Sequence, residues 1–269
     1  MIGQRNILDE IDILSMSPLI LVGPRGSGKK TLIKELAHIC GIDNIIYIDK
    51  TLTDITKMSM HSIVTNTIVV FDFTKPMQQK QFVSFENSLL KILEDTPMYC
   101  RFILLVENEY VLLDTILNRC RVQYIQPYSI EDLFDIADIC GNYNIKDYSS
   151  DQLRYINYPN DVITAPTCEE LDKIETLIDT ILSSIYNANI SNILSITKKL
   201  KFNEEGNGYD IDLFMNIFNH KLVGMVVNNS DRKYIDMHNM FSKLLYMCSS
   251  PSSNKKNLLE EFLLSIKYM

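Results

Sequence analysis

One segment of the chain reads Leu19-Ile-Leu-Val-Gly-Pro-Arg-Gly-Ser-Gly-Lys-Lys-Thr31, an apolar run followed by a glycine-rich turn and two lysines. Gly23, Gly28 and Lys29 fit the G-x-x-x-x-G-K pattern of phosphate-binding loops. The apolar run predicts a strand before the turn, and residues 31–39 predict a helix after it. Because a strand, this turn and a helix in that order are the context the pattern requires, the sequence predicts a nucleotide site here.

The residue types in the turn explain how it would hold phosphate groups. Its glycines permit backbone conformations that other residues avoid, so that amide N–H groups can point at phosphate oxygens. Lys29 adds a positive charge, and the N-terminus of the following helix adds its dipole. The predicted nucleotide-binding residues are Gly23, Pro24, Arg25, Gly26, Ser27, Gly28, Lys29, Lys30, Thr31 and Asp72. The alternative is a glycine turn that binds no ligand.

The position after Lys29 departs from the pattern. A Ser or Thr whose hydroxyl contacts magnesium is usual there, whereas this chain has Lys30, with Thr31 one place later. We expect the bound nucleotide to be ATP or ADP, with Thr31 and Asp72 as the magnesium ligands. The departure favours binding of the nucleotide over its hydrolysis.

A second acidic element ends the run Thr67-Ile-Val-Val-Phe-Asp72. A run that is apolar on successive residues is typical of a strand covered on both faces by helices. Asp72 stands where an acid holds magnesium through water in nucleotide-binding folds, although it could instead cap a turn. Phe73 stands where enzymes of this class that split ATP usually carry a glutamate to orient the attacking water, which again predicts weak hydrolysis.

Predicted strands and helices alternate through the first half of the chain. The predicted strands are 19–22, 44–48, 67–72, 101–106 and 122–125, and the predicted helices are 31–39, 84–94 and 112–117. This alternation predicts an α/β fold with a parallel sheet, right-handed crossovers and a ligand at the carboxyl ends of the strands.

Composition narrows the classes of protein to consider. A chain of 269 residues with 46% hydrophobic residues suits two or three small domains with real cores. A net charge of −8 argues against a free-standing nucleic-acid binder. No signal peptide or membrane span is predicted, so we expect a cytoplasmic protein with no membrane partner. The six cysteines include no C-x-x-C pair, which favours reduced thiols and argues against zinc.

An ordered set of motifs resembles a known family. The segments Glu86-Asn-Ser-Leu-Leu-Lys-Ile-Leu-Glu-Asp-Thr-Pro97, Phe102-Ile-Leu and Thr115-Ile-Leu-Asn-Arg-Cys120 resemble the signature of clamp-loader AAA+ ATPases. They are most similar to the delta-prime type of subunit in bacterial and phage DNA polymerase III, to which the eukaryotic replication factor C small subunits are related. Gly3-Gln4 and the segment Pro127-Tyr-Ser-Ile-Glu-Asp-Leu133 also match this family.

The resemblance implies a role for Arg119. In that family the Ser-Arg-Cys motif supplies an arginine to the neighbouring subunit's ATP site, and here the motif reads Asn118-Arg119-Cys120. Arg119 is therefore expected to act as a trans arginine finger, the alternative being an ordinary surface arginine. The family's sensor positions fall on Val106 and Glu107, and its second sensor arginine, expected within residues 158–163, is missing.

The remaining chain is predicted to be helical. We predict a P-loop domain over residues 1–128, a small helical lid over 129–168 and a helical collar for oligomerisation over 169–269. Collar helices are predicted near 171–185, 191–202, 210–227, 231–248 and 254–267. Lys198, Lys199 and Lys201 form a basic cluster that would be a solvated helix face or a phosphate contact.

The resemblance implies a DNA-replication role in bacteria or in phage-infected cells. The chain would be a weak or inactive ATPase within a hetero-oligomeric ring of clamp-loader subunits, which loads a sliding clamp onto primer-template DNA. Two alternatives stay open: a self-sufficient ATPase that uses Glu107 as its base, and a nucleotide-free scaffold whose glycine loop is vestigial.

Overall fold

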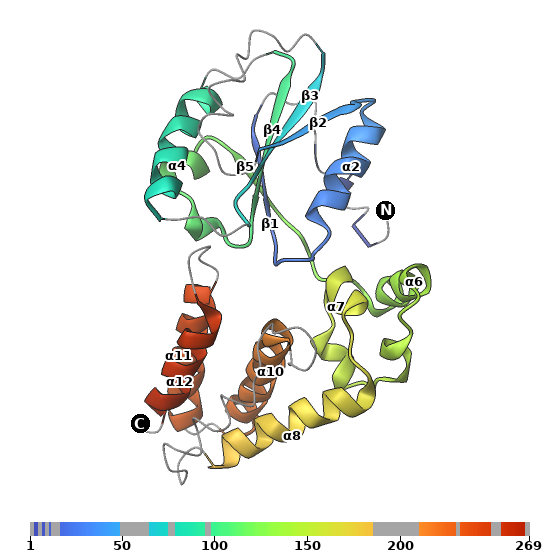
Figure 1. Ribbon diagram of the computed structural model, residues 1–269, viewed down its shortest axis with the longest axis vertical. Helices are drawn as coiled ribbons and strands as arrows, with labels where there is room; N and C mark the ends of the chain where they lie inside the picture. The colour runs from blue at the N-terminus through green and yellow to red at the C-terminus, as the bar shows by residue number, and fades with distance from the viewer. Residues whose placement is uncertain are drawn as a thin grey trace. The chain divides into compact units, whose positions relative to one another are not determined.

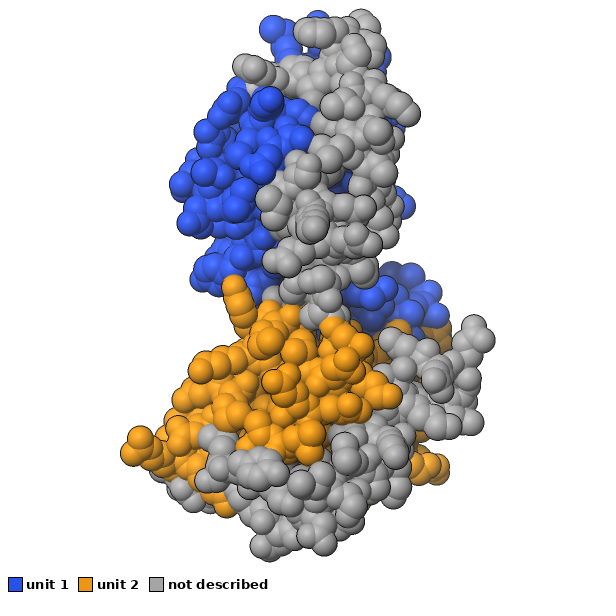
Figure 2. Space-filling view, turned by 60° about the vertical axis from the view of Figure 1, so that its left-hand side comes forward, with its two compact units in different colours: residues 1–140, 157–163 blue, residues 141–156, 164–269 orange. Residues whose placement is uncertain are grey.

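The computed structural model describes residues 3–4, 7–8, 11, 17–48, 65–74, 79–94, 98–184, 210–229, 232–248 and 254–266. The chain forms two compact units, one of residues 1–140 and 157–163 and the other of residues 141–156 and 164–269 (Figure 2). The helix predicted near 191–202 and the basic cluster at Lys198, Lys199 and Lys201 lie outside the described residues. The division into three domains stays a prediction.

A five-stranded parallel sheet forms the centre of the first unit (Figure 1). In spatial order its strands are β2 (Asn44–Ile48), β3 (Thr67–Asp72), β4 (Cys100–Val106), β1 (Leu19–Val22) and β5 (Arg121–Tyr124). All four strand pairs are parallel, and Val22 at the end of β1 lies opposite Val106 and Tyr124. The glycine loop therefore leaves the sheet between two neighbouring strands, at the carboxyl edge where this class of fold binds ligands.

Helices α2 (Lys29–Ile39) and α4 (Gln79–Glu94) lie on opposite sides of this sheet (Figure 1). Successive strand residues point to opposite faces, so Ile20, Val69 and Phe71 share one apolar core with Leu89 of α4. Helix α2 buries Leu32, Ile33 and Leu36. The central strands β3, β4 and β1 are buried on nearly every residue because both faces of the sheet are covered there, whereas the edge strands β2 and β5 are partly exposed.

Helix boundaries differ from the predicted ones at a few ends. Helix α2 begins at Lys29, because Gly28 with φ of +88° caps it, and α4 begins at Gln79. The short helix predicted near 112–117 is α5 (Asp114–Leu117), preceded by the 3₁₀ turn η2 (Glu109–Val111). The first unit also contains α6 (Ile130–Cys140) and α7 (Pro159–Ile163).

The second unit is helical in its described part. Its elements are η3 (Asn144–Asp147), η4 (Gln152–Tyr155), α8 (Cys168–Ser184), α10 (Ile211–Asn229), α11 (Arg232–Cys248) and α12 (Lys255–Ile266). Phe218 of α10 is fully buried, and its ring centroid lies 4.9 Å from that of Phe241, 5.9 Å from Phe262 and 6.0 Å from Phe214. Aromatic rings at such separations pack favourably, so this cluster joins α10, α11 and α12 into one core.

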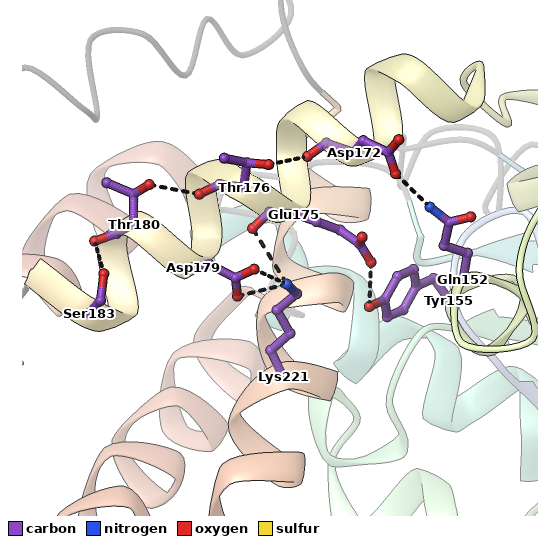
Figure 3. Close-up of polar contacts among 9 residues, drawn as sticks. All are labelled: Gln152, Tyr155, Asp172, Glu175, Thr176, Asp179, Thr180, Ser183 and Lys221. Carbon is purple, nitrogen blue, oxygen red and sulfur yellow. Dashed lines mark hydrogen bonds and ion pairs between the residues drawn. The ribbon is translucent and has the colours of Figure 1, made fainter.

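Polar side chains attach η4 and α10 to α8 (Figure 3). The contacts join Gln152 to Asp172 at 2.9 Å, Tyr155 to Glu175 at 2.8 Å and Lys221 to Asp179 at 2.7 Å. Burial, together with the hydrogen bond that its hydroxyl donates to Glu175, raises the pKa of Tyr155. These contacts explain why residues 141–156 belong to the second unit although the following residues return to the first.

None of the helices in the described ranges is both long enough and apolar enough to cross a membrane.

Truncating the aromatic cluster tests the packing of the second unit. Phe218→Ala is expected to lower the free energy of unfolding by ~3–5 kcal/mol, because it leaves a cavity among three other rings. Val227→Ala on the same helix, where the side chain is 73% exposed, is the control, with an expected change within about 0.5 kcal/mol. Urea unfolding followed by circular dichroism gives both values, and equal losses would contradict this packing.

Candidate nucleotide-binding site

The glycine loop is fastened to the sheet by its own backbone. The N–H of Gly23 donates to the carbonyl of Val106 at the end of β4, at 3.1 Å. Gly26 and Gly28 have φ values of +78° and +88°, in the left-handed region that favours glycine. The carbonyl of Gly28 accepts from Leu32 at 2.9 Å, and α2 begins directly after the loop. The loop therefore presents a helix N-terminus at the carboxyl edge of the sheet.

Lys29 is buried within the loop that precedes it. Its ammonium donates to the carbonyl of Gly23 at 2.5 Å, to that of Pro24 at 2.8 Å and to the hydroxyl of Ser27 at 3.4 Å. Burial lowers the pKa of Lys29 to about 8, although the charges of Glu107 and Asp72 act in the opposite direction. Phosphate oxygens would replace these carbonyls as stronger, charged acceptors.

Asp72 ends β3 and forms an ion pair with Lys30. The ammonium of Lys30 lies 2.7 Å from Oδ2 of Asp72, whose side chain is 1% exposed. Oδ1 accepts from the hydroxyl of Thr74 at 2.5 Å and from its backbone N–H at 3.1 Å. Burial alone would raise the pKa of Asp72, but the contacts with Lys30 and Thr74 outweigh it and lower the pKa below its usual value. The carboxylate is thus ionised and surrounded by donors.

The loop and the end of β3 border a cavity of about 410 Å³, within the range of small-molecule sites. The lining residues are Arg25, Gly26, Ser27, Gly28, Lys29, Lys30, Thr31, Asp72, Thr74, Leu105, Pro159, Asn160 and Ile163. Three of these residues are cationic and one is anionic, so the lining carries a net positive charge that suits phosphate groups. The predicted site residues from Arg25 to Thr31, together with Asp72, therefore come together, while Gly23 and Pro24 hold Lys29.

Helix α7 supplies a wall of the cavity that the sequence did not single out. The N–H of Asn160 donates to the carbonyl of Gly26 at 3.2 Å. A Cβ atom at Gly26 would lie 2.1 Å from the Cβ of Asn160, so these two residues are in closest contact. Pro159 and Ile163 complete this wall. One feature of the sequence pointed to this segment: the family that the chain resembles carries a sensor arginine that is expected within residues 158–163.

Two further segments, Gly3-Gln4 and residues 126–128, contact each other, and the second also contacts the glycine loop. Gln4 is buried and donates from Nε2 to the carbonyl of Gln126 at 2.8 Å. Gly3, with φ of +78°, lies against the ring of Tyr128, and the hydroxyl of Tyr128 reaches the carbonyl of Ser27 at 3.5 Å. Burial raises the pKa of Tyr128 to about 12, so it stays a neutral donor. The Gly3-Gln4 pair thus contributes to the position of the loop.

A magnesium ion prefers oxygen ligands in octahedral geometry at ~2.0–2.1 Å. The predicted ligands Thr31 and Asp72 both line the cavity. However, the oxygens of Asp72 already contact Lys30 and Thr74, and a lysine holds the position of the usual hydroxyl. The residues present therefore do not fit a bound magnesium ion. In the described ranges, no three His, Cys, Asp or Glu residues cluster as a metal site.

Three positions that the family resemblance associates with ATP hydrolysis are Phe73, Val106 and Glu107, and the first two are apolar. Phe73 is 3% exposed and packs in the same core as Phe71 and Leu89. Val106 is also buried at the end of β4. Glu107 follows it, half-buried, and its negative charge acts on Lys29.

Arg119 lies at the opposite end of the sheet from the glycine loop. It comes just before β5, which starts at Arg121 opposite Leu19, the first residue of β1. Its guanidinium donates to the carbonyl of Thr115 at 2.7 Å and pairs with Glu94 at 2.6 Å. Arg119 is not among the described residues that line the cavity, and its side chain is 38% exposed.

Part of the chain matches a family of known proteins by sequence. Residues 41–129, which span β2 to β5 and include Asp72 and Arg119, match the family described as DNA polymerase III, delta subunit. Over these residues, about a third of the chain, the predicted resemblance to DNA polymerase III subunits is confirmed. The matched segment begins after the glycine loop, so the evidence for a nucleotide site rests on the geometry above. A search of curated proteins finds no significant match.

Solved structures agree at the level of the fold. Two single-residue variants of RuvB from Thermotoga maritima align with 98% of this chain and 88% of theirs, at 15% identity and a TM-score of 0.50. A DNA polymerase III gamma subunit-related protein from Thermotoga maritima aligns with 98% of this chain and 97% of its own, at 14% identity and a TM-score of 0.41. The RuvB structures are similar to this chain in fold, and the predicted parallel α/β sheet followed by a helical region is confirmed.

Substituting Gly26 tests the contact between the loop and α7. Gly26→Ala is expected to destabilise the protein by ~1 kcal/mol through its positive φ, and by a further ~1–3 kcal/mol through overlap with Asn160. Gly41→Ala is a matched control, because Gly41 also has a positive φ of +63° but nothing within 4 Å of an added Cβ. Urea unfolding measures the difference.

Asn160→Gly removes the opposing Cβ, so the double variant Gly26→Ala with Asn160→Gly is expected to recover much of the extra loss. A Gly26→Ala variant no less stable than Gly41→Ala would contradict the contact.

Proposed function

We propose that this chain is a clamp-loader subunit that binds ATP or ADP in the cavity beside Lys29, hydrolyses it weakly or not at all, and presents Arg119 to a neighbouring ATPase subunit. The observation that carries the proposal is the cavity itself. It combines a helix N-terminus, left-handed glycines and the cations Arg25, Lys29 and Lys30 in one place. Anionic phosphate groups are the chemistry that such a site recognises.

The surroundings of Asp72 support weak hydrolysis. Hydrolysis needs a group that orients the attacking water and a charge that stabilises the transferred phosphoryl group. Phe73 cannot accept a hydrogen bond from water, and it is buried in the apolar core. The carboxylate of Asp72 is committed to Lys30 and Thr74. The cavity therefore offers binding groups without the partner residues that hydrolysis requires.

The position of Arg119 supports action on another subunit. A guanidinium at the amino end of β5 is separated from the loop of its own chain by the length of β1. It is exposed, and the ion pair that holds it involves Glu94, which is 54% exposed. Exposed ion pairs stabilise by ~0–1 kcal/mol, so Arg119 can exchange Glu94 for a phosphate oxygen at small cost.

The partners follow from the same proposal. Other clamp-loader subunits would form a hetero-oligomeric ring with this chain, and the ring would load a sliding clamp onto primer-template DNA. The family match supports such an assembly, because it covers the segment that carries Arg119. The division into a P-loop domain, a lid and a collar belongs to this proposal as well.

Lys29→Ala tests the nucleotide site. With magnesium present, the wild-type chain is expected to bind ATP or ADP and to release little phosphate, whereas Lys29→Ala is expected to bind at least about tenfold more weakly, because it loses a charge-assisted contact. Calorimetric titration and a phosphate-release assay on the same sample give both readouts. Steady phosphate release that Glu107→Gln abolishes would favour the self-sufficient ATPase instead. Absence of binding would favour the scaffold.

Arg119→Ala tests the finger. In the assembled ring, it is expected to lower ATPase activity and clamp loading by about tenfold or more, since trans arginines stabilise the transition state strongly. Glu94→Gln is the control, because it releases the same guanidinium without removing it and should leave the rates near wild type. Nucleotide binding by the isolated variant should be unchanged. Wild-type rates from a ring containing Arg119→Ala would exclude the finger role.

A further inference from the structure

We propose that Lys30 takes the place of a magnesium ion, so that this chain binds its nucleotide independently of divalent cations. This inference rests on the proposed nucleotide site and specifies how that site neutralises charge. It starts from the disagreement described above, in which the cavity has a P-loop but its Asp72 does not fit a magnesium ligand.

The ammonium of Lys30 already performs one task of the metal. In a site with magnesium, the cation neutralises the acid at the end of the strand and the phosphates together. Here Lys30 lies 2.7 Å from Asp72, a carboxylate whose side chain is 1% exposed. Because an uncompensated buried carboxylate is costly, removing this ammonium would leave a strongly unfavourable charge.

Lys30 also has the capacity to hold phosphate. An ammonium has three donors, and the contact with Asp72 uses one of them. Lys30 lines the same cavity as Lys29 and Arg25, and its side chain is 51% exposed. Lys30 is therefore both paired with Asp72 and exposed at the cavity, where its ammonium can also bind a phosphate oxygen.

Neighbouring residues fix the position of Lys30. Its ammonium lies 5.7 Å from the ring centroid of Tyr47 on β2, within the range of a cation–π contact. Thr74 occupies the other oxygen of Asp72, so the carboxylate cannot turn easily toward a metal. A magnesium ion entering here would have to separate the ion pair and lie beside two lysine ammoniums. Like-charge repulsion and the lost ion pair both oppose this.

Calorimetric titration with ATP and ADP, in excess EDTA and in excess magnesium chloride, tests the inference on the full chain. The wild-type affinity is expected to change by no more than about twofold between the two buffers. Lys30→Ser restores the usual hydroxyl and removes the ammonium. This variant is expected to bind about tenfold or more weakly than wild type in EDTA, and to recover when magnesium is added.

Two variants serve as controls. Lys34→Ser removes a lysine from an exposed position further along α2 and should leave binding in both buffers unchanged. Lys30→Arg keeps a cation and should stay independent of magnesium. Circular dichroism and thermal unfolding check that each variant is folded.

The outcomes separate this inference from the proposed function. Wild-type binding that disappears in EDTA would overturn the inference and leave the nucleotide site standing. Equal binding by Lys30→Ser and wild type in EDTA would do the same. Absence of binding in both buffers would overturn the nucleotide site and the inference together. If Lys30→Ser does not fold, the wild-type comparison between the two buffers still decides the question.

Discussion

The placement of β1 between β4 and β5 is the constraint on which the first unit depends. A strand paired on both sides and covered on both faces has no freedom to shift, so its last residue, Val22, fixes where the glycine loop begins. The hydrogen bond from Gly23 to Val106 continues the sheet by one step into the loop. Burial of the apolar strands β1, β3 and β4 therefore determines where the polar cavity lies. The backbone hydrogen bonds between the strands fix the start of the loop, and no polar side chain is needed for this.

The sequence predicted most of this framework. Apolar runs and the glycine pattern were sufficient for the five strands, for α2 and for the loop from Arg25 to Thr31 that lines the cavity, because each signal is local. The cavity wall formed by Asn160 could not be predicted in the same way, since it depends on a contact between residues far apart in the chain. The sequence showed that Lys30 replaces the usual Ser or Thr. Its ion pair with Asp72 could not be predicted, because the two residues lie on different elements, α2 and β3.

The glycine loop and Arg119, the two parts of the first unit to which we assign a function, lie at opposite ends of one sheet. The glycine loop follows the carboxyl end of β1, while Arg119 precedes the amino end of β5. A parallel sheet makes this separation unavoidable, because every strand runs in the same direction. A chain built in this way can keep one end for holding a nucleotide and offer the other to a neighbour. The apolar Phe73, which directly follows Asp72, therefore lies at the end of the sheet opposite the one that carries Arg119.

The cavity is discontinuous along the chain, and this has a consequence for how the protein acquires it. Residues 157–163 belong to the first unit, whereas the residues on both sides of them belong to the second. During synthesis the sheet can be complete once β5 has emerged, but the wall that rests on Gly26 arrives after residues 141–156 have been made. A fragment ending at Cys140 would contain the glycine loop without Asn160. The cavity therefore becomes complete only after residues 141–156 of the second unit have been made.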